Sequence, residues 1–285
     1  MSKISQCFFH VYRYQILPLS QQTPLFFRED IKNIKELKKR KNEFFAKSIL
    51  EIQKLLYSRA DLIHKIIFND EDLIILKIGV GRILNRNKPD FTEEEIDNWP
   101  NLLIILNNKE NIQKAAIQFN RNAFSSTNTV AQLLEKTINS YLDKYFLKSH
   151  FKPIFTKQYF WDVVEKYPAG ITQACFEMIS PNMSNISDSL NLDLRLLNET
   201  TNTQETNLEL NSDKSSHLSF DKDDKFITSL VEYASQGGGN ITMKVKGVKK
   251  KIHTSDSITE YEIDEFEIKD SSPRELADIF KGFLL

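Results

Sequence analysis

The chain of 285 residues has a formal net charge of −1, with 40% hydrophobic and 27% charged residues, a composition typical of folded globular proteins. Its 20 Phe and 9 Tyr argue against a disordered chain, and its two cysteines argue against a disulfide-rich secreted scaffold. No apolar stretch reaches the ~20 residues that a membrane span needs, so we expect a cytoplasmic protein with no membrane span.

The first part of the chain predicts one long helix among several short strands. Aromatic and β-branched residues at 7–19 indicate a first strand, which is interrupted at Pro18. From residue 29 to about 57, apolar residues recur every three or four positions, a spacing that predicts a helix. Four more strands are expected at 62–68, 73–84, 102–106 and 115–119.

The second part of the chain predicts a mixture of helices and strands. Helices are expected at 126–147, 156–166, 224–236 and 273–284, the first after a Ser/Thr cap and the last with proline at its first position. Alternating residues predict strands at 171–179 and 190–196, and weaker strands at 208–210 and 218–220. Residues 240–248 and 259–268 are expected to pair as a β-hairpin around the loop 249–257.

These elements predict an α+β fold. Short strands separated by turns favour largely antiparallel sheets with packed helices over a regular βαβ alternation. The change from strands to helices near residue 122 predicts two domains. Domain 1–122 would contain the basic helix, and domain 123–285 would contain a helical connector, an acidic insertion at about 187–222 and a lysine-rich hairpin.

Charge is distributed unevenly along the chain. Residues 1–170 hold 26 Lys and Arg against 19 Asp and Glu, so this part is basic. Residues 171–285 hold 12 Lys and Arg against 20 Asp and Glu, so this part is acidic. Two clusters of positive charge stand out, one on the first long helix and one on the hairpin inside the acidic part. Their members are Lys35, Lys38, Lys39, Arg40 and Lys41 on the helix, and Lys244, Lys246, Lys249, Lys250 and Lys251 on the hairpin.

Both basic clusters are candidate nucleic-acid-binding sites. Clustered positive charge neutralises phosphates and releases counterions without any sequence-reading motif, and a hairpin tip suits the groove of a duplex. We expect DNA as the partner in preference to RNA. The alternative is that each cluster is only a solvated face, since Lys39 can pair with Glu43 at i,i+4 spacing.

Two short motifs suggest metal or carboxylate chemistry, but structural roles explain them better. Cys7 and His10 have the spacing of a zinc pair, yet no second pair exists to complete four ligands. Thr92 and Glu95 fit a capping box, so the carboxylates at 93–95 are expected at a helix N-terminus. We therefore expect no catalytic residue, no metal and no cofactor.

A divergent metal-dependent nuclease is an alternative. Glu267 and Lys269 match the Glu-X-Lys pattern of such nucleases, and on a strand both would point to the same side. The pattern also needs an earlier aspartate, and Asp256 lies in the expected loop.

The order of elements in the second half resembles that of RexA-like prophage exclusion proteins and KwaB-like phage-defence proteins. The resemblance is carried by Phe176-Glu177-Met178-Ile179-Ser180-Pro181-Asn182, by a helix at 225–235, and by Ile241-Thr242-Met243-Lys244-Val245-Lys246 before a closing strand. It covers about 190 residues, concerns layout and has no signature residues. It implies DNA binding without sequence specificity, and dimerisation.

Two functions from different classes follow. The first is a non-catalytic, sequence-tolerant nucleic-acid-binding protein in anti-phage defence or prophage exclusion. The second is a protein-interaction or toxin-like component of a defence system, whose protein partner would bind the acidic segment 187–222.

Overall fold

The computed structural model describes residues 6–21, 31–180 and 194–284, which form an α+β fold with antiparallel sheets, as the sequence predicts. Its internal contacts divide the chain into two compact units. Unit 1 consists of Met1–His10, Phe44–Tyr141 and Glu260–Leu285, and unit 2 of Val11–Glu43 and Leu142–Thr259. Each unit combines segments that are far apart in the sequence, and the expected domains 1–122 and 123–285 stay a prediction.

Unit 1 is built on a sheet whose strand order is β13-β1-β7-β6-β3-β2. The strands are β1 (Gln6–Pro18), β2 (Leu62–Asn69), β3 (Leu73–Val80), β6 (Asn101–Asn107), β7 (Lys114–Gln118) and β13 (Glu260–Asp264). The ladders β2–β3, β3–β6, β6–β7 and β1–β13 are antiparallel. Residues on both sides of β3 and β6 are buried, so this part of the sheet is covered on both faces.

Two helices cover opposite faces of this sheet, α2 (Thr127–Leu142) and α8 (Pro273–Phe283). The ring of Phe9 packs edge-on against Phe280 of α8, with centroids 4.8 Å apart. The next residue, His10, bonds through Nδ1 to Oγ1 of Thr127 at 2.7 Å. Neighbouring residues of a strand point to opposite faces, so α8 and α2 lie on opposite sides of β1.

The ends of these helices follow their cap residues. The Ser126 hydroxyl accepts from the Thr129 backbone N–H at the start of α2, at 3.3 Å. In α8, Ser272 and Glu275 form a reciprocal capping box, with Pro273 at the first helical position. Helix α1 (Ile34–Leu50) is shorter than the helix expected at 29–57, because the chain leaves the helix after Leu50 and runs irregularly to β2.

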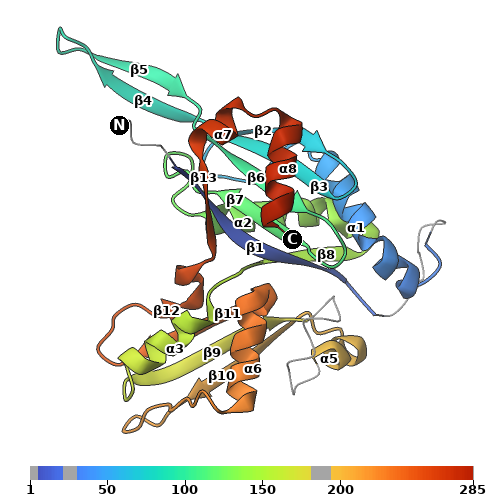
Figure 1. Ribbon diagram of the computed structural model, residues 1–285, viewed down its shortest axis with the longest axis vertical. Coiled ribbons are helices and arrows are strands. Elements are labelled where there is room, and N and C mark those ends of the chain that lie inside the picture. Colours follow the sequence, from blue (N-terminus) through green and yellow to red (C-terminus); the bar gives the residue numbers. More distant parts are fainter. Residues whose placement is uncertain (1–5, 22–30, 181–193, 285) are drawn as a thin grey trace. The chain divides into compact units, whose positions relative to one another are not determined.

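Strands β4 (Arg82–Asn87) and β5 (Glu93–Asn98) form a separate two-stranded ribbon, here called the arm, which projects from the sheet of unit 1 (Figure 1). Two expectations are corrected here. The single strand expected at 73–84 is divided at Gly81 into β3 and β4, and the carboxylates at 93–95 lie on a strand, not at a helix start. The Thr92 N–H and hydroxyl instead bond to Asp90 in the turn.

Unit 2 contains a second sheet in the order β10-β9-β11-β12. Its strands are β9 (Ile171–Ile179), β10 (Glu205–Asn211), β11 (Gly239–Val245) and β12 (Ile252–His253), all paired antiparallel. Helices α3 (Lys157–Lys166) and α6 (Lys225–Tyr233) lie on one face of it (Figure 1). Phe160, Phe176 and Val231 are buried between these layers. In addition, β8 (Leu147–Pro153) pairs with the second half of β1.

Four expectations for the second half are corrected by the structure, and the first concerns residues 218–220, which lie in a loop and not on a strand. Residues 259–268 do not pair with β11: β13 pairs with β1, and α7 (Glu265–Asp270) follows it. Helix α2 ends at Leu142, after which a short 3-10 turn and β8 replace the end of the expected helix 126–147. Leu194 and Leu196 lie on helix α5 (Leu194–Thr201) and not on a strand, while 190–193 lie outside the described residues.

Other expected elements are confirmed. These are the strands at 62–68, 102–106, 115–119 and 171–179, the helices at 156–166, 224–236 and 273–284, and a strand around 208–210. No described helix is long and apolar enough to cross a membrane.

Candidate nucleic-acid interface

Five lysines gather on a hairpin of unit 2, here called the lysine hairpin, which consists of β11, β12 and the turn between them. Lys244 lies near the end of β11, Lys246 directly follows the strand, and Lys249, Lys250 and Lys251 precede β12; all five are exposed. Alternation along β11 explains the first two, because Met243 and Val245 face the core and Lys244 faces away from it. The structure therefore brings the expected hairpin lysines together, although β12 replaces the expected partner strand.

The five hairpin lysines are not held in ion pairs within the described part of the chain. None of them forms an ion pair with any residue that the structure describes. The turn that presents them is defined: Gly247 has a φ of 82°, a region that favours glycine, and the Val248 N–H donates to the Val245 carbonyl at 3.1 Å. Unpaired ammonium groups on an ordered turn are suited to binding phosphates.

Buried polar contacts fix the base of the lysine hairpin. The Thr254 side chain is fully buried, and its hydroxyl accepts from the Ile241 backbone N–H at 3.0 Å. The same hydroxyl donates to Oδ1 of Asn240 at 3.0 Å, and this oxygen also accepts from the Ser255 N–H. On the outward side, Nδ1 of His253 bonds to the Thr242 hydroxyl at 3.0 Å. These bonds hold the two strands of the hairpin in register.

Acidic groups border the lysine hairpin on the same sheet. The register places Glu209, Cys175, Thr242 and His253 in one row across the four strands, on the face that looks away from the helices. Hydrogen bonds from Asn211 and Gln173 lower the pKa of Glu209, with a smaller contribution from Lys251. An ionised Glu209 on β10 repels phosphate, so the β12 end of the sheet is the favourable end for a polyanion.

The basic helix differs from the lysine hairpin in that its charges do not share a face. Consecutive helical positions are rotated by about 100°, so Lys38, Lys39, Arg40 and Lys41 point in four directions. Lys41 lies on the buried stripe of α1 and is only 5% exposed. Arg40 pairs with Glu43 at 2.8 Å and Lys38 lies 3.8 Å from Glu199. Lys35 and Lys39 are the exposed members, four residues apart on one side.

The residues considered for metal or nuclease chemistry are dispersed. Glu267 and Lys269 lie on helix α7, where positions two apart point to different sides, so the expected strand face does not exist. Lys269 instead pairs with Glu265 at 2.5 Å. The Cys7 thiol accepts from Gln118, and burial is the main cause that raises its pKa. The described residues contain no group of three or more His, Cys, Asp or Glu arranged to hold a metal ion.

The leucines of the acidic segment 187–222 mostly serve the core of unit 2. Leu194 is buried, and Leu197, Leu208, Leu210, Leu218 and Phe220 pack against the core between the sheet and α3 and α6. Residues 187–193 lie outside the described part of the chain. Of the alternating leucines in the described residues, Leu194 is explained by packing, whereas Leu196 is 55% exposed.

Sequence reasoning missed the exposed apolar surface of the arm. Ile83 is 64% exposed, Leu84 51% and Phe91, in the turn between the strands, 97%. The register pairs Leu84 with Ile96 on one face of the ribbon. The sequence did contain a signal for this ribbon. The turn residues Asn87-Lys88-Pro89-Asp90 lie between two runs of alternating residues, a pattern that predicts a hairpin and competes with the capping-box pattern.

The sequence matches no protein-family model, and neither a curated protein nor a solved structure matches it.

Proposed function

We propose that the protein binds nucleic acid without reading its sequence, with DNA preferred over RNA, and that it acts in anti-phage defence or prophage exclusion. The observation that supports binding is the lysine hairpin, whose five exposed lysines have no ion-pair partner among the described residues. The layout resemblance to RexA-like and KwaB-like proteins supports the defence role and a dimeric state. No catalytic step is part of the proposal.

Salt dependence of binding tests the proposal. Duplexes of unrelated sequence are expected to bind with similar affinity, and the affinity should fall steeply between about 50 and 200 mM salt. Replacing Lys249, Lys250 and Lys251 by Ala removes three phosphate contacts. The negative slope of log K against log salt should therefore become shallower by up to about three. Fluorescence anisotropy with labelled duplexes of DNA and RNA measures both quantities.

A charge-matched variant separates a local effect from a change in net charge. Lys166→Ala/Lys214→Ala/Lys225→Ala removes three exposed lysines of the same unit outside both clusters, and it should leave the slope nearly unchanged. An equal loss of DNA affinity and of salt dependence in both triple variants would refute the role of the lysine hairpin. The absence of binding by the unaltered protein at low salt would refute it too. A Lys35→Ala/Lys39→Ala variant measures the contribution of the basic helix.

A second candidate function, protein interaction, is favoured by the arm. Its residues 82–98 hold three basic and five acidic side chains, so this ribbon is unsuited to phosphate, and its exposed apolar residues are suited to a protein surface. A photo-crosslinking amino acid at Phe91 is expected to trap one specific partner in cells, whereas the same group at Lys65 on β2 should not. Identical crosslinking patterns at the two positions would dismiss this candidate.

A further inference from the structure

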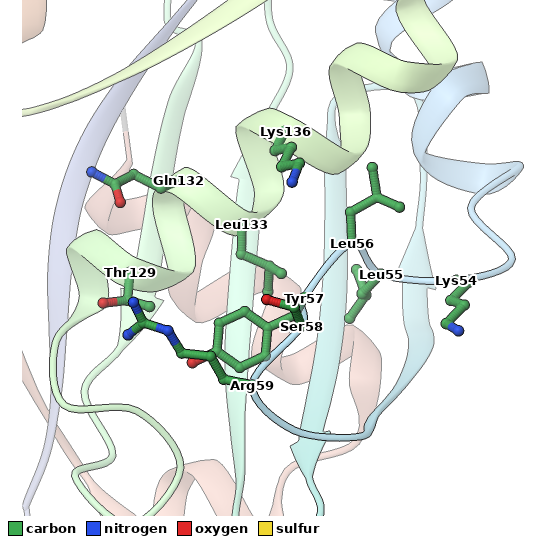
Figure 2. Close-up of a pocket in the computed structure, with 10 residues that line it drawn as sticks. All are labelled: Lys54, Leu55, Leu56, Tyr57, Ser58, Arg59, Thr129, Gln132, Leu133 and Lys136. Atoms are coloured by element: carbon green, nitrogen blue, oxygen red, sulfur yellow. The ribbon is translucent and has the colours of Figure 1, made fainter.

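A pocket of about 640 Å³ opens in unit 1 between helix α2 and the irregular segment that follows α1. This segment, residues 51–61, is here called the connector. Figure 2 shows the pocket, with the Tyr57 ring between the connector and α2, the Arg59 guanidinium beside Thr129, and Lys54 at the opposite end. A pocket of this size falls within the range of small-molecule sites.

The connector wall of the pocket is held in place before any ligand binds. Ile52 and Leu55 are buried and anchor the segment. The Gln53 N–H donates to the Tyr141 hydroxyl and the Leu56 N–H to the Thr137 hydroxyl, each at 3.0 Å. Thr137 and Tyr141 are one turn apart on α2, so a single helix face fixes two backbone positions of the connector.

Helix α2 supplies the other wall. Thr129, Gln132, Leu133 and Lys136 follow the spacing i, i+3, i+4 and i+7 and therefore share one face of the helix. Thr129 belongs to the first turn, where the helix dipole favours an anion, although its own N–H donates to the Ser126 hydroxyl. The hydroxyls of Ser58 and Thr129 and the amide of Gln132 add neutral hydrogen-bond donors.

Three cationic side chains line the pocket, and none of its described lining residues is acidic. Lys54 and Arg59 come from the connector and Lys136 from α2. All three are exposed, and none has an ion-pair partner among the described residues. Like charges lining one concave site repel one another and sum to a positive field, so an anion that enters the pocket is stabilised.

The pocket also has an apolar side suited to a planar group. The Tyr57 ring is held edge-on against Phe124, with centroids 5.5 Å apart, so its orientation is fixed. Leu55 and Leu133, each 4% exposed, add buried aliphatic surface beneath the opening. Stacking on an aromatic ring is sequence-tolerant for nucleobases because every base has a π-face.

We propose that this pocket binds a nucleoside phosphate, with its phosphates along the side of the pocket lined by Arg59 and Lys136 and its base against Tyr57, while Lys54 adds positive charge at the opposite end. Its ligand is a free nucleotide or one unstacked nucleotide of a single strand, because both present the same phosphate and base. The pocket lies in unit 1 and contains none of the lysines of the hairpin, so this proposal goes beyond the proposed function and does not depend on it.

Isothermal titration of the full chain with ATP, AMP, inorganic pyrophosphate and an eight-nucleotide oligothymidylate tests the proposal. ATP is expected to bind one site per chain and more tightly than AMP or pyrophosphate. Arg59→Gln/Lys136→Gln should weaken ATP binding at least tenfold, since two charge-assisted contacts are lost. Tyr57→Leu should weaken ATP but leave pyrophosphate unchanged. Oligothymidylate binding that is lost in the same variants identifies the single strand as a source of the ligand.

Control variants separate this site from the lysine hairpin. Lys65→Gln/Lys109→Gln removes two exposed lysines of unit 1 outside the pocket and should leave ATP binding within twofold of the original. The Lys249, Lys250 and Lys251 triple variant should retain ATP binding even if it loses duplex DNA. The proposal is overturned if neither ATP nor the oligonucleotide binds, or if the pocket variants bind as tightly as the original. Equal affinity for ATP and pyrophosphate would overturn the role of Tyr57.

Discussion

The backbone N–H of Leu56 donates a 3.0 Å hydrogen bond to the hydroxyl of Thr137, which ties the connector to α2. Thr137 is fully buried, so its replacement by Val keeps the shape but removes the acceptor. We expect Thr137→Val to lower the free energy of unfolding by about 1 kcal/mol and to weaken nucleotide binding. Urea denaturation and titration with ATP check the two effects. Tyr141→Phe, which removes the acceptor of Gln53, should act in the same direction, and unchanged stability in both variants would contradict this account.

The stability of unit 2 should depend on His150. Burial lowers its pKa to about 4, with smaller lowering effects from Lys148 and Lys152, while a bond to Gln204 opposes the shift. The unfolded chain therefore binds more protons than the folded chain between about pH 6.5 and pH 4, and stability is lost as the pH falls through this window. The full effect amounts to roughly 3 kcal/mol.

A pair of histidine variants isolates this contribution. His150→Gln should flatten the decline of the denaturation midpoint between pH 6.5 and pH 4, because the titrating group is gone. His217→Gln replaces an exposed histidine of the same unit and should leave the decline as it is. Parallel curves for all three proteins would show that His150 is not the group responsible.

Gly239 is required by the close approach of two strands. A Cβ built at this position would lie 1.7 Å from the carbonyl oxygen of Glu177, which belongs to the backbone and cannot rotate away. Gly239→Ala should therefore destabilise the protein by about 3 kcal/mol or more, measured as a shift of the urea midpoint. Gly282→Ala on α8, where a Cβ meets nothing within 4 Å, should be neutral or slightly stabilising. Similar midpoints for the two variants would disprove the steric argument.

Phe91 in the turn of the arm has an unfavourable backbone conformation for its side chain. Its φ is 66°, in the left-handed region that costs an ordinary L-residue about 1–2 kcal/mol, and 97% of the residue is exposed. Asn tolerates this region, so Phe91→Asn should raise the free energy of unfolding by about 0.5–1 kcal/mol, measured by thermal or urea denaturation. Phe91→Leu keeps the penalty and should not stabilise. If both substitutions destabilise, the Phe91 side chain has a stabilising contact in the folded chain.

Local signals in the sequence predicted elements whose ends are set by cap residues. Ser126 and Ser272 mark the starts of α2 and α8, and both accept a backbone N–H three residues later. The exposure of Lys244 followed from the alternation of β11. These features depend on residues close in the chain, so periodicity and capping identify them.

Partner strands and competing local patterns were not predictable in the same way. Alternation indicates that 260–264 is a strand. It does not show which strand is its partner, which in the structure is β1, where Ile263 pairs with Cys7, instead of the expected β11. Thr92 and Glu95 fit the capping-box pattern of a helix start, yet the turn before them joins β4 to β5 and Glu95 lies on a strand. The pocket was missed because Arg59 and Lys136 are 77 positions apart and meet only in the folded chain.

The pairing of β1 with β13 has a consequence for how the protein is made. Cys7 and Ile263 are 256 positions apart, so a ribosome that adds about 5–20 residues per second completes β1 long before β13 exists. During that interval the hydrogen-bonding groups on one edge of β1, beside the buried side chain of Phe9, have no strand to pair with. Nascent chains that have not reached Glu260 are thus the form of this protein most exposed to misassociation and most in need of a chaperone.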